Sequence, residues 1–236
     1  MVTKNDSDMK TIAIIVAGGS GSRFGAQMPK QFLELGGKPI LMRTIEAFEQ
    51  SLDGGNHEII VTLPADQMDL WRDLCERHGF AVPHRVVSGG ETRWHSVKNA
   101  LDCISGVDDI DVIAVHDGVR PLASADLINR VLEAAQSDGA AIPVVSLNDS
   151  VRQVTGGTSH ALDRSSLRAV QTPQAFDARL LMQAYGYPFE PTFTDDASVV
   201  ERAGHSVTLV EGDPRNLKIT RPMDLALAEY LLNQDA

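Results

Sequence analysis

A glycine-rich segment near the N-terminus carries two basic residues seven positions apart. It runs IVAGGSGSRFGAQMPKQF over residues 15–32, and its cations are Arg23 and Lys30. Backbone N–H groups of a glycine-rich turn can approach phosphate oxygens closely, especially after a strand. Cations beside them stabilise the negative charge of a phosphoryl-transfer transition state. We therefore predict that Arg23 and Lys30 form a catalytic pair at a phosphate site.

The glycine spacing excludes the two commonest nucleotide fingerprints. Gly19, Gly21 and Gly25 form G-x-G-x-x-x-G, whereas a dinucleotide-binding loop needs G-x-G-x-x-G. A Walker A loop needs Lys after its last glycine, and here Ala26 follows. Taken alone, the segment could also be a flexible turn with surface cations.

A second candidate is HDGVRP, residues 116–121, which ends an apolar run. A carboxylate at the end of a strand, beside a phosphate loop, is well placed to hold Mg²⁺ together with substrate phosphates. Asp117 is therefore a candidate metal ligand, although an Asp-Gly turn explains the same residues. His116 is expected to be a packed or hydrogen-bonded strand residue, because no second His or Cys lies at metal-ligand spacing.

Two further segments carry candidate binding groups. In SGGETRWHSV, residues 88–97, Gly90 can bring backbone to a ligand and Ser96 can bond a base or ribose, while Thr92 is equally suited to cap a helix. In RNLKITRPMDL, residues 215–225, Lys218 precedes a helix predicted to start at Pro222. By itself this lysine is typical of a solvated surface group.

The elements that must position these residues alternate between short β-branched runs and longer amphipathic ones. This alternation predicts an α/β fold with a mostly parallel sheet and helices on both faces. Strands are expected at 11–17, 57–63, 84–88, 111–117, 140–146 and 205–211, and clear helices at 40–50 and 224–232.

Residues 147–170 interrupt the alternation. Two polar segments flank the sequence TGGT at 155–158, which indicates a β-hairpin. A two-stranded hairpin is marginal alone in water, so we expect a partner subunit to support it. We predict one domain over residues 1–236 with this segment as a protruding dimerisation arm.

Composition limits the possible partners. The net charge is −11 with a pI of about 5.0, which disfavours nucleic acid and membrane surfaces as partners. Cys75 and Cys103 lie far apart without metal-site spacing, and residues 1–10 lack an apolar leader. A cytoplasmic, reducing location is the simplest expectation.

Taken together, the motifs AGGSGSRFG, MPKQF, SGGETRWHSV, HDGVRP, RAVQTPQAF and NLKITRPMDLALAE resemble the 2-C-methyl-D-erythritol 4-phosphate cytidylyltransferase family of the non-mevalonate isoprenoid pathway. The resemblance extends from about residue 10 to 233. It implies a single-domain Rossmann-like nucleotidyltransferase fold and a homodimer with interlocked β-arms. It also implies Mg²⁺-dependent transfer of CMP from CTP to 2-C-methyl-D-erythritol 4-phosphate, with release of pyrophosphate.

The resemblance further implies roles for single residues. The catalytic cations would be Arg23, Lys30, Arg164 and Lys218. The nucleotide would contact Ala17, Gly18, Gly19, Gly90 and Ser96. The acceptor would contact Asp117, Arg120, Ser150 and Thr172. Asp117 would also hold the metal, and the neighbouring subunit would supply Arg120, Ser150 and Arg164.

Three alternatives remain at this point. Ribitol-5-phosphate cytidylyltransferase uses the same chemistry on another polyol phosphate. A non-catalytic nucleotide-binding regulator would need neither the cation pair nor a metal carboxylate. A sugar transferase of similar fold would be expected to carry paired metal carboxylates, whereas HDG offers one.

Overall fold

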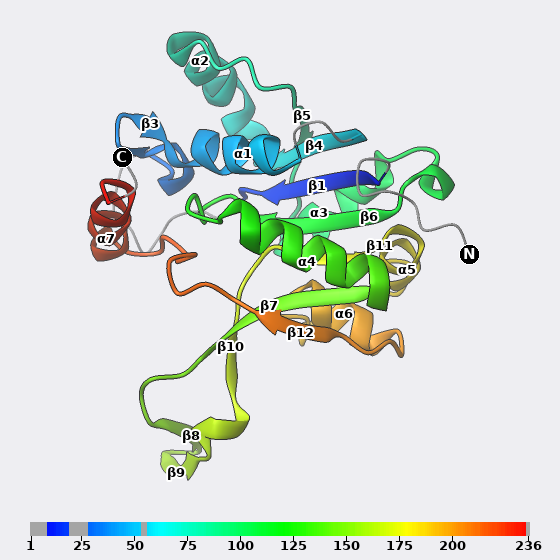
Figure 1. The fold of residues 1–236 in the computed structure, drawn as a ribbon, viewed down its shortest axis with the longest axis vertical. Coiled ribbons are helices and arrows are strands. Elements are labelled where there is room, and N and C mark those ends of the chain that lie inside the picture. Colours follow the sequence, from blue (N-terminus) through cyan, green and yellow to red (C-terminus); the bar gives the residue numbers. More distant parts are fainter. Residues whose placement is uncertain (1–8, 19–27, 53–55, 235–236) are drawn as a thin grey trace.

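The computed structural model describes residues 9–18, 28–52 and 56–234 of the protein. Its centre is an eight-stranded sheet of order β10-β7-β11-β6-β1-β4-β5, with β12 paired to β7 (Figure 1). The strands are β1 (Lys10–Val16), β4 (Asn56–Leu63), β5 (Arg85–Ser88), β6 (Val112–Asp117), β7 (Ala140–Ser146), β10 (Arg168–Val170), β11 (Gln174–Asp177) and β12 (Thr208–Glu211).

Helices cover both faces of this sheet. One apolar core lies under α1 (Ile40–Ser51), α2 (Met68–His78) and α4 (Ala125–Asp138). The other lies under α3 (Arg93–Asp102), α5 (Ala178–Ala184) and α6 (Asp196–Arg202). Alternate side chains of β1 serve the two cores, with Ile15 in the first and Ile14 in the second. The molecule is therefore a three-layer α/β domain.

A smaller apolar cluster joins the C-terminal helix to the body. Helix α7 (Pro222–Leu232) begins at Pro222, as predicted, and packs near β2 (Glu34–Leu35), which pairs with β3 (Lys38–Pro39). Ala228 is its buried residue, and it packs with Ile219 and Leu35. Among the described residues, no helix combines the length and apolarity needed to cross a membrane.

The predicted mostly parallel sheet is confirmed, and all six expected strands form with small shifts at their ends. The pairs β1–β4, β1–β6, β4–β5 and β7–β12 are parallel. Strands β10 and β11 were not predicted, and they insert antiparallel beside β7 and β6. They span three and four residues, which is too short for a periodic pattern to identify a strand from the sequence.

The predicted hairpin forms at 151–162 from β8 (Val151–Thr155) and β9 (Thr158–Leu162). Gly156 and Gly157 have φ of 56° and 82°, the left-handed values that a two-residue hairpin turn requires. Every side chain of the two strands is exposed except the half-buried Val151 and Leu162. Figure 1 shows this arm extending away from the body of the domain.

Candidate active site

The candidate site lies where β1, β4, β5 and β6 end. Val16 is in register with Thr62 on one side and with Asp117 on the other. Carboxyl ends of parallel strands therefore meet at one edge, and the strand order reverses beside β1, where open α/β sheets bind ligands. A cavity of about 400 Å³ occupies this edge. The predicted site residues that line it are Ala17, Gly18, Lys30, Gly90, Ser96, Asp117 and Lys218.

The start of α3 forms one wall of this cavity. Thr92 caps the helix by accepting from the His95 N–H, as its residue type suggested. The Ser96 hydroxyl is buried, accepts from Gly90 N–H at 3.1 Å and donates to the Thr92 carbonyl at 3.0 Å. A Cβ on Gly90 would lie 2.4 Å from the Cβ of His95. Only glycine therefore lets the loop backbone lie this close to the helix.

Lys30 is held near the end of β1 by its neighbour Gln31. Lys30 begins a short 3₁₀ helix, η2 (Lys30–Phe32), directly after Pro29. The buried Gln31 amide donates to the Ala17 carbonyl at 2.9 Å and to Gln67 Oε1 at 2.7 Å. These two bonds fix the backbone that carries Lys30 beside Ala17, at the end of β1.

Asp117 is surrounded by cations. Its Oδ2 lies 2.9 Å from Lys218 Nζ and 3.3 Å from Arg120 Nε, and its Oδ1 lies 3.5 Å from Arg93 Nε. Burial alone would raise the pKa of this carboxyl, but Arg93, Lys218 and Arg120 together hold the pKa well below its usual range. Asp117 is thus a stable carboxylate at neutral pH.

A second hollow of about 280 Å³ adjoins the first. Arg93, Asp117 and Lys218 line both, so they form the wall between them. Arg120 and Thr172 also line the second hollow, together with Thr194, which sequence reasoning missed. Two adjoining pockets with cations between them suit two anionic ligands that meet at this wall.

The hydrogen bonds of His116 and Thr172 fix the end of β6. The Asp117 N–H donates to Thr172 Oγ1 at 3.0 Å, so the hydroxyl proton is available for His116 Nδ1 at 3.1 Å. His116 Nε2–H then donates to the Arg120 carbonyl at 3.1 Å. Burial lowers the pKa of His116 to about 4, so the ring stays neutral. The expected hydrogen-bonded role of His116 is confirmed.

Lys218 reaches the site because residues 213–219 are tied to it by polar contacts. Arg120 Nη1 donates to the Asn216 carbonyl at 2.7 Å, and the buried Asn216 amide donates to the Thr172 carbonyl at 2.8 Å. The Gln171 amide donates to the Asp213 carbonyl at 2.8 Å. Sequence reasoning missed Asn216 and Gln171. The one available signal was their position inside the motifs NLKIT and VQTPQ.

One residue role implied by the resemblance needs correction. Arg120 was expected to serve the neighbouring subunit's site, but its buried side chain pairs with Asp117 of its own chain. The reason is local, because the turn after β6 brings Arg120 N–H back to the Asp117 carbonyl at 3.1 Å. Arg120 therefore belongs to the site of its own chain.

The remaining predicted residues lie elsewhere. Ser150 and Arg164 are exposed on the arm and line neither hollow, and Arg164 donates to the Asn148 carbonyl. Arg23 and Gly19 lie outside the described residues, so their predicted roles stay predictions.

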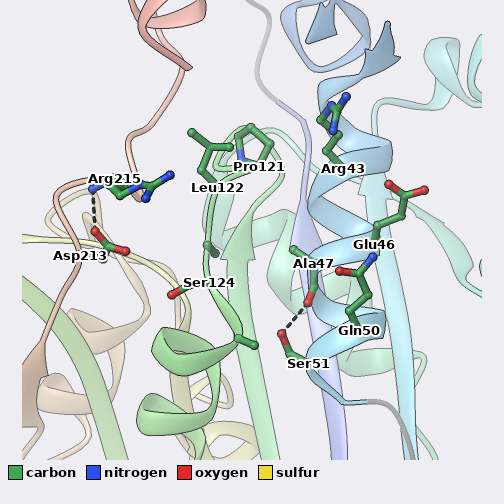
Figure 2. Close-up of a pocket in the computed structure, with 12 residues that line it drawn as sticks. Arg43, Glu46, Ala47, Gln50, Ser51, Pro121, Leu122, Ser124, Asp213 and Arg215 are labelled. Atoms are coloured by element: carbon green, nitrogen blue, oxygen red, sulfur yellow. Dashed lines mark hydrogen bonds between the residues drawn. The ribbon is translucent and has the colours of Figure 1, made fainter. Parts of the chain in front are cut away.

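The protein also has a larger surface hollow of about 470 Å³, lined by α1 and by residues 121–125, 213 and 215 (Figure 2). None of the predicted site residues lines it. Arg43, on its rim, donates to the carbonyls of Leu35 and Gly36. This hollow is therefore not the candidate active site.

Comparison with known proteins identifies the family. Residues 11–234 match the model of the 2-C-methyl-D-erythritol 4-phosphate cytidylyltransferase family. The chain belongs to this family. The enzyme of this name from Bacteroides fragilis is 51% identical over 220 residues, which cover 93% of this chain and 98% of that protein.

Solved structures of the family share the fold. The enzyme of Thermus thermophilus has a TM-score of 0.72 and 34% identity, covering 93% of this chain and 98% of the other. The 4-diphosphocytidyl-2C-methyl-D-erythritol synthase of Anaerococcus prevotii has a TM-score of 0.79 and 28% identity, covering 97% of this chain and all of the other. The expected α/β nucleotidyltransferase fold is confirmed.

Proposed function

We propose that this chain transfers CMP from CTP to 2-C-methyl-D-erythritol 4-phosphate. The products are 4-diphosphocytidyl-2-C-methyl-D-erythritol and pyrophosphate. The observation that supports this most directly is the pair of adjoining hollows with Arg93, Asp117 and Lys218 in their common wall. A reaction between two phosphate-bearing substrates needs two such sites in contact. Family membership favours the methylerythritol acceptor over the ribitol, sugar-transferase and regulator alternatives.

The first hollow suits the nucleotide. Backbone at Ala17, Gly18 and Gly90 is open to a ligand because these residues follow strand ends and carry little or no side chain. In the proposed complex, Gly90 and Ser96 face the cytosine and ribose, and Lys30 faces the phosphates. Gly19 and Arg23 would extend this contact along the glycine-rich segment.

The second hollow suits the acceptor. In the proposed reaction, an acceptor phosphate oxygen attacks the α-phosphorus of CTP in line, a new P–O bond forms, and the bond to pyrophosphate breaks. Lys218 and Arg120 hold the attacking phosphate, with Thr172 in the same pocket wall, and Lys30 with Arg23 balances charge on the α-phosphoryl oxygens. Asp117 keeps Lys218 and Arg120 together between turnovers.

Asp117 does not fit the role of magnesium ligand that the sequence suggested. Three cations already surround its carboxylate, and they would repel a divalent ion. Among the described residues, no cluster of three or more His, Cys, Asp or Glu could hold a metal. Magnesium dependence stays part of the proposal, with the ion bound through the nucleotide's own phosphates rather than through Asp117.

The arm suits a homodimer. Its strands are polar and exposed, yet Val154 projects from it with 71% of its surface accessible. A hairpin of this kind is marginal alone in water. We propose that a second copy covers the arm and that Ser150 and Arg164 complete the partner's acceptor pocket. A cytoplasmic location stays a prediction from the sequence.

The direct test is pyrophosphate release from CTP with each acceptor in turn. We expect release with 2-C-methyl-D-erythritol 4-phosphate. With ribitol 5-phosphate we expect a kcat/KM at least a hundredfold lower, because the wrong acceptor leaves buried polar groups of the site without hydrogen bonds. Omitting the acceptor gives the background. Equal or better activity with ribitol 5-phosphate would contradict the proposed acceptor.

A further inference from the structure

Arg93 lies in the wall between the two hollows, although neither the sequence nor the resemblance assigned it a role. It is the first residue of α3, and its side chain is 25% exposed. Together with Asp117 and Lys218 it lines both cavities. A residue in this place can influence how the two ligands meet.

The Arg93 guanidinium bridges two carboxylates. Its Nε lies 3.5 Å from Asp117 Oδ1, and its Nη2 lies 2.7 Å from Asp196 Oδ2. A guanidinium presents separate donor edges in fixed geometry, so one side chain can hold both acids at once. Burial would lower the pKa of Arg93, but Asp196 and Asp117 raise it, so the bridge stays charged.

The far end of this bridge is anchored. Asp196 is fully buried at the start of α6, and its Oδ1 accepts from the Tyr185 hydroxyl at 2.6 Å. The backbone N–H groups of Asp196 and Ala197 both donate to Gln174 Oε1 at 3.0 Å, which ties α6 to β11. Asp196 therefore cannot follow Arg93 if the guanidinium moves.

The near end acts on the acceptor pocket. Arg93 holds Oδ1 of Asp117, while Lys218 and Arg120 share Oδ2 of the same carboxylate. The rotation of that carboxylate thus depends on Arg93, and the positions of both cations depend on the carboxylate. Thr194, just before the Asp195 cap of α6, lines the same pocket.

We propose that Arg93 is a positioning residue. Anchored by Asp196 and Tyr185, it orients Asp117 so that Lys218 and Arg120 are set for the acceptor phosphate. This inference rests on the proposed function, because it gives these two cations the acceptor as their ligand. It adds a charged connection from α6, on one face of the sheet, to the reacting groups.

The test uses Asp196→Asn, which keeps the side-chain shape and a partner for Tyr185 but removes the charge that anchors Arg93. We expect the KM for 2-C-methyl-D-erythritol 4-phosphate to rise about tenfold, the size expected when a contact to a charged group is misplaced. The KM for CTP should change less than twofold, because Lys30, Gly90 and Ser96 are untouched. Acceptor KM within twofold of wild type in the folded variant would overturn the proposal.

Val131→Ala is the matched control for lost stability. Val131 is fully buried in α4, under the opposite face of the sheet, so its truncation lowers the unfolding temperature without reaching Arg93. An equal rise of acceptor KM in this control would also overturn the proposal. If Asp196→Asn does not fold, Tyr185→Phe removes one hydroxyl from the same anchor, and we expect about a threefold rise in acceptor KM. If the acceptor KM of Tyr185→Phe does not rise, the proposal is likewise overturned.

A double-mutant cycle separates a shared role from two independent ones. If Arg93 and Asp196 act as a unit, Arg93→Gln with Asp196→Asn should raise acceptor KM no more than Arg93→Gln alone. If the increases in acceptor KM of the two single variants add up in the double variant, Arg93 and Asp196 do not act as a unit. Failure of the proposed function is distinguishable from failure of this inference, because it would leave the wild type itself inactive with this acceptor.

Discussion

At the scale of single residues, Asp117 shows how partners define a role. An aspartate at the end of a strand beside a phosphate loop suits magnesium, but Lys218, Arg120 and Arg93 occupy its oxygens. A carboxylate in this position organises cations for an anionic ligand. The residue type allowed both roles, and the charges around it favour the second.

This difference is measurable with Asp117→Asn. We expect the acceptor KM to rise about tenfold, because the neutral amide holds Lys218 and Arg120 less tightly. The Mg²⁺ concentration for half-maximal rate should stay within twofold of wild type. The measurement is the rate of both proteins at saturating CTP and acceptor over a range of Mg²⁺ concentrations. If Asp117→Asn instead needs several times more Mg²⁺ than the wild type, Asp117 is a magnesium ligand.

His116 provides a pH prediction at the same scale. Its folded pKa is about 4 against an ordinary value of 6.5, so between these values the unfolded chain binds the extra proton. The stability associated with neutral His116 is therefore complete above pH 6.5 and is lost as pH falls toward 4, by at most about 1.4 kcal/mol per pH unit.

The variant His116→Gln removes that proton while keeping an acceptor for Thr172 and a donor for the Arg120 carbonyl. Its free energy of unfolding, measured in urea between pH 7 and 4.5, should fall less steeply than that of the wild type. Other histidines titrate equally in both proteins, so the difference isolates His116. Parallel curves would contradict the assignment.

At the scale of elements, the site is built from strand ends and the helix start that follows one of them. The loop between β5 and α3 can place Gly90 against Ser96 because position 90 has no side chain. Gly90→Ala would put a Cβ 2.4 Å from the His95 Cβ and 3.0 Å from its carbonyl carbon. The loop must then move away from α3.

We expect Gly90→Ala to raise the KM for CTP about tenfold or more while the acceptor KM changes little, since the displaced loop lines only the first hollow. Gly79→Ala is a suitable control. Its φ of 57° makes alanine strained at this position, yet nothing lies within 4 Å of the new Cβ. Gly79 lines neither hollow. Equal CTP binding in the two variants, measured by calorimetry, would exclude the loop as a nucleotide contact.

At the scale of the whole molecule, the net charge is negative while the site is lined by cations. The chain carries a net charge of −11, yet Lys30, Arg93, Arg120 and Lys218 gather around two small hollows. Small anions can bind there while long polyanions are repelled by the rest of the surface. The arm lies outside this body, so the contribution that we propose for Arg164 needs a second copy of the chain.

Subunit mixing tests that contribution. Lys30→Ala and Arg164→Ala should each be nearly inactive, Lys30→Ala by about a hundredfold because it loses a transition-state charge contact. After exchange, half of the dimers are mixed, and each has one site with both defects and one with neither. Activity should therefore recover to about a quarter of wild type under closed two-fold symmetry.

Lys30→Ala mixed with Lys218→Ala is the matched control, because these lysines line the same cavity of one chain. Every site in its mixed dimers carries one defect, so activity should not recover. Mass spectrometry of differently labelled chains confirms that exchange has occurred. No recovery with Arg164→Ala despite exchange would place Arg164 in the site of its own chain, and the arm would need another explanation.

The local sequence determined the parallel core and the edge of the sheet at which the first hollow lies. The β-branched runs at 11–17, 84–88 and 111–117 predict strands whose carboxyl ends meet. Ala17, Gly90 and Asp117, at or just after these ends, line the first hollow. The hairpin turn was equally readable, because paired glycines favour the left-handed backbone that the turn needs. Each of these signals lies within a few residues along the chain.

Only the tertiary structure decided which charges share the site and how they are held. Lys218 contacts Asp117 across about a hundred residues of chain, Asn216 bonds to Thr172, and Asp196 anchors Arg93. Strands β10 and β11 are likewise fixed by antiparallel partners rather than by their own few residues. The contacts of Lys218, Asn216 and Asp196 each join one polar side chain to a distant segment, and they leave no periodic pattern in either segment. The sequence therefore predicts where the site is, and only the folded chain shows which charged groups contact Asp117 and Arg93 there.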